Sequence, residues 1–121
     1  MGKFVLRQVP TGVKFDLVAS NGQTILSSEI YTSRAAAIKG IASIRANAPI
    51  ANVENRTEET FVRLAHPKFE MYQDKAGQFR FRLRARNGKI VGVSEGYTSK
   101  AGCLGGIDSV KTNAAEAETE E

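Results

Sequence analysis

Four arginines recur at every second position of this 121-residue chain, as Arg80, Arg82, Arg84 and Arg86. Alternate side chains of a β-strand point to the same face, about 7 Å apart. Because guanidinium groups bind phosphate oxygens through paired hydrogen bonds, a row at this spacing could contact a nucleic-acid backbone or another anionic partner. The alternative is a solvated strand face with acidic cross-strand partners. We favour this alternative, since no aromatic side chain is interleaved on that face for base stacking.

A glutamate and a tyrosine form a second candidate site, which occurs twice, as Glu29 with Tyr31 and as Glu95 with Tyr97. Each pair precedes a predicted helix, whose N-terminal N–H groups could help to bind a small anion or a hydrogen-bonding ligand. Alternatively, the carboxylate supports the start of the helix and the tyrosine packs there. Because both parts of the chain keep the pair, we favour the structural role.

The sequence offers little for catalysis or metal binding. Its one cysteine and one histidine, Cys103 and His66, exclude an internal disulfide and a histidine-rich metal site. Cys103 takes the place of Ala37 on an apolar helix face, so we expect a buried small side chain. Neither a phosphate-binding loop nor a nucleophile elbow is found. We therefore expect a protein that is not an enzyme and needs no cofactor.

The charge of the chain is unevenly distributed. The net charge is +4, although four of the last six residues, 116–121, are glutamates. A basic body with an acidic tail is typical of a protein with an anionic partner. No apolar run approaches the roughly 20 residues of a membrane span. The first residues are too polar for a secretion signal, so we expect a cytoplasmic protein without a membrane contact.

The elements that position these residues come from an internal repeat. Residues 15–48 align without a gap with residues 81–114, and 16 of the 34 pairs are identical. Each repeat reads as a short strand, an alternating strand, a reversal at Asn21-Gly22 or Asn87-Gly88, a third strand, a helix and a weaker last strand. At the second reversal, a three-residue loop with a glycine bulge would place Val91 and Val93 beside Leu83 and Phe81. A two-residue loop would place Ile90 there instead, and we favour the bulge.

The residue pattern of the two predicted helices indicates close packing against a neighbouring element. Ala37, Ile38, Ile41 and Ile44 have helical spacing, as do their equivalents Cys103, Leu104, Ile107 and Val110. A glycine lies in the middle of each helix, as Gly40 and Gly106, at a cost of about 1 kcal/mol relative to alanine. Its occurrence in both repeats indicates that the helix backbone lies close to another element, which we expect to be the sheet.

About 50 residues bury too little apolar surface to fold alone without a metal or a disulfide. We therefore expect one domain with a shared core, made of repeat one (residues 1–54), a connector (55–68) and repeat two (69–121, with the acidic tail 116–121). The predicted fold is α+β, with tandem β-β-β-α-β repeats that share one antiparallel sheet. Both helices should pack on one face of this pseudo-twofold structure. We expect a monomer whose two repeats are arranged like the two subunits of a dimer.

Three segments of repeat two, with matching segments in repeat one, closely resemble the YegP-like family of small bacterial proteins. They are Asn87-Gly88-Lys89-Ile90-Val91, residues 94–101 and residues 106–111. The resemblance covers nearly the whole chain and implies tandem repeats, or dimers of single repeats, that exchange their last strands. It implies no established function, catalytic residue or cofactor. We expect a module that binds a protein partner or small ligand, with weak nucleic-acid binding through the arginine row as the alternative and an enzyme as the least favoured.

Overall fold

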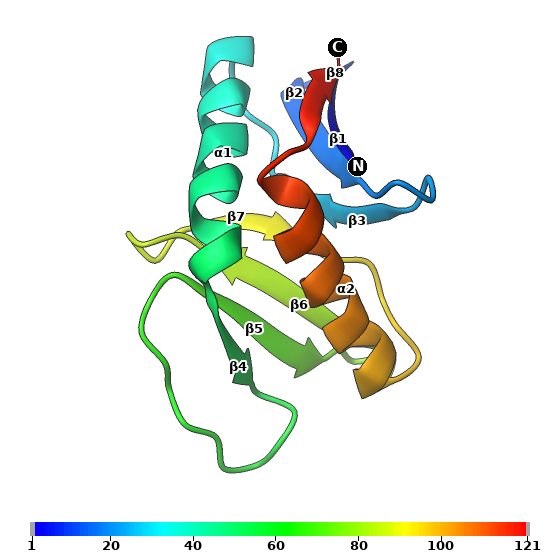
Figure 1. The fold of residues 1–121 in the computed structure, drawn as a ribbon, viewed down its shortest axis with the longest axis vertical. Coiled ribbons are helices and arrows are strands. Elements are labelled where there is room, and N and C mark those ends of the chain that lie inside the picture. The colour runs from blue at the N-terminus through cyan, green and yellow to red at the C-terminus, as the bar shows by residue number, and fades with distance from the viewer. Residues whose placement is uncertain (1, 121) are drawn as a thin grey trace.

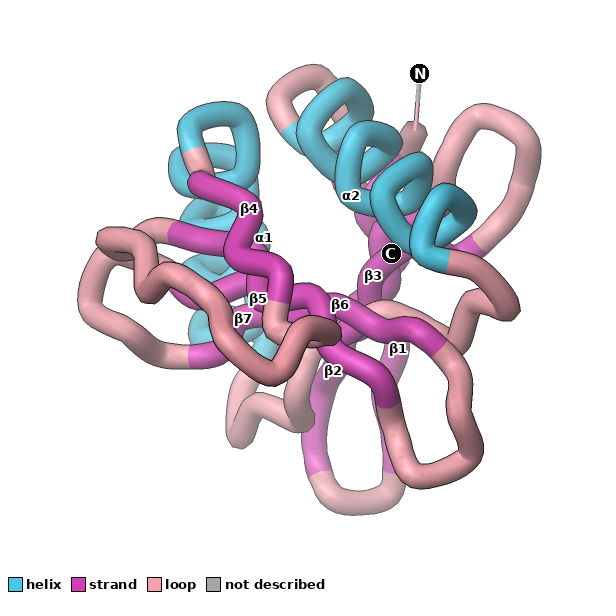
Figure 2. The backbone as a smooth tube through the Cα atoms, turned by 90° about the horizontal axis from the view of Figure 1, so that it is seen from below, coloured by secondary structure: helices cyan, strands magenta, loops and turns pink. Residues whose placement is uncertain are grey.

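The computed structural model describes residues 2–120 of the chain. In this range, eight strands form one sheet, and two α-helices pack on one of its faces (Figure 1; Figure 2). Repeat one contains β1 (Lys3–Val9), β2 (Gly12–Val18), β3 (Thr24–Ser27), α1 (Arg34–Asn47), the short 3-10 helix η1 (Ala48–Ile50) and β4 (Asn52–Asn55). Repeat two contains β5 (Lys68–Gln73), β6 (Phe79–Arg84), β7 (Ile90–Val93), α2 (Lys100–Ala114) and β8 (Glu118–Glu120). The predicted α+β class and order of elements are confirmed.

The two repeats exchange their last strands. The sheet order is β4-β5-β6-β7-β3-β2-β1-β8, so that the last strand of each repeat lies beside the first strand of the other. The six inner strands pair antiparallel, whereas β4 and β8 pair parallel with β5 and β1. The expected antiparallel pairing is therefore wrong at the two sheet edges. The acidic tail contributes β8, at the opposite end of the sheet from β4 and the arginine-rich strand β6.

Both Asn-Gly reversals are three-residue loops with a glycine in the left-handed region, as predicted. Gly22 has a φ of 87° and Gly88 a φ of 82°. A further bulge follows in each hairpin, and in repeat two it pairs Leu83 with Gly92 and Arg82 with Val93. Val91 is buried at this bulge, but Val93 faces the helix-free side. The expected position of Val93 beside Phe81 is therefore wrong, because the second bulge shifts the strand by one residue.

Each helix begins after a serine that accepts a hydrogen bond from the first turn: Ser33 from the N–H of Ala36, and Ser99 from that of Gly102. The buried face of α1 contains Ala37, Gly40, Ile41 and Ile44. Ile38 and its equivalent Leu104 are 38% and 42% exposed, so their predicted burial is wrong. The mid-helix glycines take the buried places instead.

These glycines make room for tyrosines. A Cβ at Gly40 would lie 2.3 Å from the hydroxyl oxygen of Tyr31, and a Cβ at Gly106 the same distance from that of Tyr97. The helix backbone therefore approaches the tyrosine that precedes it most closely, and the sheet as expected, since the same Cβ atoms would lie 3.1 Å from the rings of Phe15 in β2 and Phe81 in β6. Each tyrosine ring in turn stacks on a strand phenylalanine, Phe15 or Phe81.

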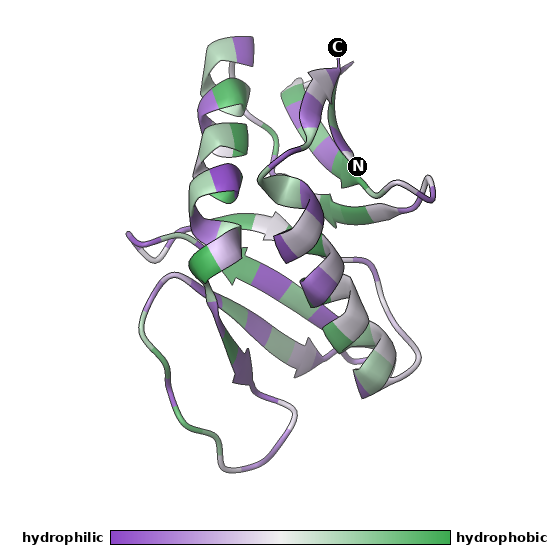
Figure 3. Ribbon diagram, viewed as in Figure 1, coloured by the Kyte–Doolittle hydropathy of each residue, from purple (hydrophilic) through white to green (hydrophobic). Residues whose placement is uncertain are grey.

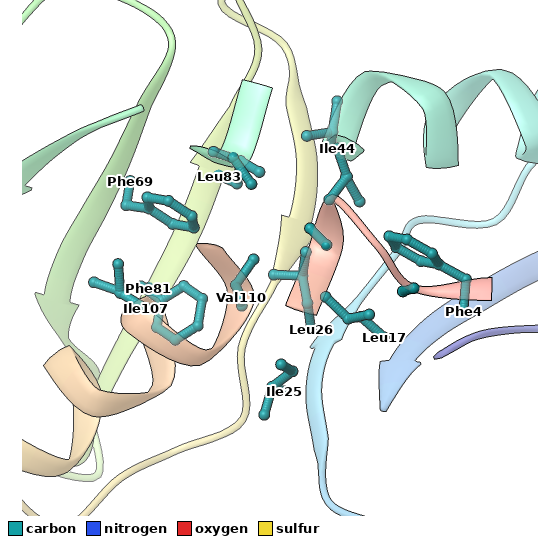
Figure 4. Packing of buried hydrophobic residues seen from close by; sticks show 14 of the residues in the cluster. Phe4, Leu17, Ile25, Leu26, Ile44, Phe69, Phe81, Leu83, Ile107 and Val110 are labelled. Carbon is teal, nitrogen blue, oxygen red and sulfur yellow. The ribbon is translucent and has the colours of Figure 1, made fainter. Parts of the chain in front are cut away.

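One hydrophobic cluster contains residues of both repeats (Figure 4). The rings of Phe4 and Phe15 in repeat one and of their equivalents Phe69 and Phe81 in repeat two are fully buried. At the junction of the repeats, Leu26 occupies the space that a side chain at Gly92 would need, since a Cβ there would lie 2.6 Å from Leu26 Cγ. Leu26 is itself the equivalent of Gly92 in repeat one. The two halves therefore complete one interior across an approximate twofold axis.

A basic helix residue ties each exchanged strand to the other repeat. The guanidinium of Arg45 lies 5.1 Å from the centre of the Phe4 ring and donates to the carbonyl of Ala117, just before β8. Lys111 lies 5.9 Å from the centre of the Phe69 ring and donates to the carbonyl of Ala51, just before β4, at 2.7 Å. These contacts hold both edge strands in place.

Candidate functional site

Six charged side chains gather on the helix-free face of the sheet. We call them the ionic cluster: Glu54, Arg56, Lys68, Glu70, Arg82 and Arg84. They come from β4, the start of the connector, β5 and β6. Alternation positions them, because Phe69, Met71, Phe81 and Leu83 are buried in the core and their neighbours along the strands point to the other face. Hydrophobic and hydrophilic residues alternate along β5 and β6 in Figure 3. The strand register places Glu70 opposite both Glu54 and Arg82.

Glu70 is the centre of the cluster. Its Oε1 atom accepts from Nε of Arg82 at 2.6 Å and from Nε of Arg84 at 2.7 Å. Its Oε2 atom lies 3.0 Å from Nη2 of Arg56 and 3.5 Å from Nζ of Lys68. The Glu70 side chain is 1% exposed. One buried carboxylate thus has four cationic neighbours. Burial by itself raises the pKa of Glu70, but the hydrogen bonds from Arg82 and Arg84 outweigh it, so that the pKa lies below the ordinary value of a glutamate.

Glu54 is equally buried and holds the connector onto the sheet. Its Oε1 atom accepts from Nζ of Lys68 at 2.7 Å and from the backbone N–H of Leu64 at 2.8 Å, while Oε2 accepts from Nε of Arg56. Burial alone would raise the pKa of Glu54, but these hydrogen bonds outweigh it and lower the pKa to about 2. The carboxylate is therefore ionised at any physiological pH.

The predicted arginine row is built differently from an open ladder. Arg80, Arg82 and Arg84 lie in β6, but Arg86 follows in the turn and is exposed. Nε of Arg80 lies 2.7 Å from Asp74 Oδ2, and Arg82 and Arg84 converge on Glu70. Three of the four arginines thus have acidic partners on the same face. The guanidinium of Arg82 also lies 5.0 Å from the centre of the Tyr72 ring.

Sequence reasoning expected acidic cross-strand partners for the arginines but did not name Glu70 or Glu54, and it did not identify the other two cations, Arg56 and Lys68. A signal for Glu70 was present, since the alternation of Phe69 and Met71 puts Glu70 on the same face as the arginines of the paired strand. Glu54 had no such signal, because its neighbour β5 is separated from it by the connector. Only the parallel pairing of β4 with β5 brings the two glutamates together.

Repeat one contains a reduced version of the cluster. Lys3 and Glu120 match Lys68 and Glu54, and their Nζ and Oε2 atoms lie 3.0 Å apart. Their side chains are 51% and 54% exposed, against 6% and 0% for the pair in repeat two. Val5 and Asp16 stand in place of Glu70 and Arg82. The connector, which reaches over Glu54, is what distinguishes the two ends.

The glutamate and tyrosine pairs before the helices lie apart from the ionic cluster. Tyr31 stacks on Phe15 with ring centres 6.0 Å apart, and burial together with the neighbouring Glu29 raises its pKa. Burial of Tyr97, together with Cys103 and Glu95, likewise raises its pKa. Glu29 and Glu95 are exposed. The tyrosines pack as the structural interpretation expects, and whether the pairs bind a ligand stays a prediction.

Little in the structure suggests chemistry at a reactive group. Within residues 2–120, no group of three or more histidine, cysteine, aspartate or glutamate side chains is placed to hold a metal ion. Cys103 is fully buried, and burial raises the pKa of its thiol to about 11, so the nucleophilic thiolate is scarce at neutral pH. Neither helix of the described range is long and apolar enough to cross a membrane.

Comparison with known proteins supports the family suggested by the sequence. The family model described as "Domain of unknown function (DUF1508)" matches residues 12–55 and 74–121. The UPF0339 protein YegP of Shigella flexneri is 42% identical over 100 residues, which are 83% of this chain and 77% of that protein. A UPF0339 protein of Treponema denticola is 60% identical over 50 residues, which are 41% of this chain but 86% of that protein.

The fold is found in a solved structure as well. The solution NMR structure of YegP from E. coli, described as a protein of unknown function, superposes with a TM-score of 0.78 at 36% identity. The match covers 98% of this chain and 90% of that one. The resemblance to YegP is confirmed, and two matched segments in one chain agree with a tandem repeat. The chain therefore belongs to the DUF1508 (UPF0339) family of YegP-like proteins, a family of unknown function.

Proposed function

We propose that the chain is a non-enzymatic module that binds an acidic segment of a partner protein through the helix-free face around the ionic cluster. The observation that carries this proposal is the charge balance of the cluster. Four cationic side chains surround two carboxylates, which leaves an excess of two positive charges. The side chains of Arg56, Arg82 and Arg84 remain 22%, 26% and 27% exposed, so each is partly accessible to a ligand.

Preorganisation supports binding at this face. Glu70 fixes Arg82 and Arg84 through their Nε atoms, so that little side-chain entropy is lost when a ligand contacts their outer nitrogens. A guanidinium presents five donors and matches a carboxylate through two parallel hydrogen bonds. The buried glutamates thus act as supports that aim the arginines outward, and a partner carboxylate would complete the charge balance.

Two features favour an acidic protein over a nucleic acid. The side chains of Arg82 and Arg84 converge on one carboxylate oxygen, which removes the regular spacing that a phosphate backbone would require. Tyr72, the aromatic ring beside the row, is covered by the guanidinium of Arg82 and so is a poor platform for base stacking.

Binding of fluorescently labelled polyglutamate and of single- and double-stranded oligonucleotides, measured by anisotropy over a salt series, tests the proposal. We expect polyglutamate to bind at low salt and to weaken as salt screens the charges. Arg82→Gln should weaken this binding roughly tenfold. The matched control is Lys14→Gln, which removes one positive charge from the same face in repeat one and should change binding less than about twofold.

Circular dichroism of both variants shows whether they remain folded. Absence of polyglutamate binding by the wild type at low salt would overturn the proposal, as would equal effects of the two substitutions. Tighter binding of an oligonucleotide than of polyglutamate would replace it with the nucleic-acid alternative.

A further inference from the structure

The exchanged strand β4 is an open edge of the sheet. It is the first strand in the sheet order and pairs on one side only, parallel with β5. The N–H groups of Asn52 and Arg56 donate to carbonyls of the β5 segment, at 3.1 and 2.7 Å. In a parallel ladder, every second residue bonds to the same neighbouring strand. The backbone groups of Val53 and Asn55 therefore point away from β5, towards the free edge.

This edge is suited to pairing with another chain. Val53 and Asn55 present two N–H donors and two carbonyl acceptors, and none of them bonds to another backbone group of residues 2–120. The other edge strand, β8, carries the exposed carboxylates Glu118 and Glu120, and charged side chains are a common protection of an edge. The one carboxylate of β4, Glu54, is buried and paired with cations. Strand β4 thus lacks the protection that β8 has.

A hollow of about 310 Å³ lies beside this edge, between β4 and the connector. Its apolar lining consists of Val53, Phe61, Val62 and Leu64. Val62 is 76% exposed, more than any other large apolar side chain of the described residues. The N–H of Leu64 donates to Glu54 and fixes the connector beside the strand, as the view from below in Figure 2 shows. An apolar side chain of an added strand would find its contacts here.

The charge at the hollow indicates which residue should accompany the apolar one. Glu58 lines the hollow, and Glu59 follows it in the connector. Both are exposed, and neither forms an ion pair with another residue in the described part of the chain. A lysine or arginine of the partner could therefore pair with Glu58 without displacing a cation of this chain.

We propose that β4 binds an extended segment of a partner protein as an additional strand of the sheet. The segment pairs with the backbone of Val53 and Asn55, inserts one apolar side chain into the hollow, and places a lysine or arginine at Glu58. Main-chain hydrogen bonds supply affinity in this mode of recognition, and the hollow and the charge supply specificity. The inference does not depend on the proposed function, which concerns an acidic segment and the arginines on the face of the sheet.

Titration of the ¹⁵N-labelled chain with the pentapeptide acetyl-KVLVK-amide tests the proposal. The first, third and fifth side chains of this peptide share one face, so that its leucine can enter the hollow with a lysine beside it. The amides of Val53, Asn55 and Val62 should shift and saturate with a dissociation constant near 1 mM. The peptide acetyl-EVLVE-amide keeps the apolar residues and reverses the charge, and it should bind at least about fivefold more weakly.

Methylation of the peptide nitrogens tests the backbone pairing. Only every second residue of an added strand turns its N–H towards β4. Methylation at the leucine and methylation at both valines therefore block opposite edges of the peptide. One of these two peptides should bind at least about tenfold more weakly than the parent, and the other should stay within about twofold. Equal effects of the two methylations would overturn the proposal.

Val53→Pro is the matching change in the protein. It removes the outward N–H in β4 but no hydrogen bond to β5, as edge strands tolerate. The control is Thr119→Pro, the same change at the equivalent place in β8. Peptide binding should fall at least about tenfold in Val53→Pro and less than about twofold in Thr119→Pro.

Circular dichroism shows whether both proline variants are folded. Glu58→Gln lies outside the strands and should weaken binding of acetyl-KVLVK-amide about threefold, which keeps the test available if Val53→Pro unfolds. No saturable shift in the wild type, equal effects of the two proline substitutions, or undiminished binding by Glu58→Gln would each overturn the proposal.

Discussion

The buried ion pair of Glu54 and Lys68 should contribute far more to stability than its exposed counterpart, Glu120 and Lys3. The two pairs occupy equivalent places in the repeats, but the pair of Glu54 is buried, and Glu54 also accepts from the N–H of Leu64 and from Arg56. Glu54→Gln keeps the shape of the side chain but removes its negative charge. The substitution leaves Lys68 buried with Glu70 as its remaining acidic neighbour, 3.5 Å away and already shared with three arginines.

The expected magnitude follows from this burial. Removal of one partner from a buried ion pair costs about 3 kcal/mol or more, because the other charge stays away from water without full compensation. Loss of an exposed pair costs less than about 1 kcal/mol. Glu54→Gln should therefore reduce the free energy of unfolding by about 3 kcal/mol, a large share of the roughly 5–15 kcal/mol of a typical domain. Glu120→Gln should change it by less than about 1 kcal/mol.

Urea unfolding followed by far-ultraviolet circular dichroism measures both values, since the chain has no tryptophan to report by fluorescence. The double variant Glu54→Gln with Lys68→Met tests the cause. If an orphaned lysine charge produces the loss, replacement of the lysine by an apolar side chain of similar length should recover part of the stability. Equal losses in Glu54→Gln and Glu120→Gln would refute the reasoning, because the connector would then have no effect on the strength of the pair.

Two further predictions concern acid and the helix glycines. Because the pKa of Glu54 is lowered from 4.5 to about 2, its contribution is complete above pH 4.5 and should be lost as the pH falls towards 2. Urea midpoints measured over this range should fall less steeply in Glu54→Gln, and an unchanged slope would contradict the assigned pKa. Gly106→Ala should destabilise the chain by more than about 1 kcal/mol, because the added Cβ would lie 2.3 Å from the Tyr97 hydroxyl oxygen. The control Gly105→Ala, which has no neighbour within 4 Å, should stabilise it by about 0.5–1 kcal/mol, and thermal unfolding that shows the two changes to be alike would argue against the tyrosine packing.

Local patterns in the sequence were sufficient for most of the fold. The repeat, the alternation of Phe81 and Leu83, and the Asn87-Gly88 reversal are encoded within a few residues of each other, and the structure follows them. The errors occur where distant segments compete for the same space. Leu104 has the helical spacing of the apolar residues, but the buried face of α2 lies at Gly106, beside the ring of Tyr97, and Leu104 is 42% exposed.

The candidate site was harder to predict because it depends on pairing between repeats. The arginines of β6 were visible as a row, but Glu54, which pairs with Arg56 and Lys68 in the same cluster, joins them only through the exchanged strand β4. The favoured interpretation of the row expected acidic cross-strand partners without identifying them, and in the folded chain two arginines of the row pair with Glu70. Sequence patterns report which face a side chain occupies, but they do not report which strand lies next to it.

Duplication itself indicates where a specific function should reside. Features that both repeats share, such as the tyrosine stacked on Phe15 or Phe81, serve the packing of each unit. Features that only one repeat has are not needed to build the unit. In repeat two the connector contacts Glu54 through the backbone N–H of Leu64, and the ion pair that is exposed in repeat one is buried there in the ionic cluster. Substitutions that exchange residues between equivalent positions therefore separate function from folding, because each replacement is already tolerated by the same backbone elsewhere in the chain.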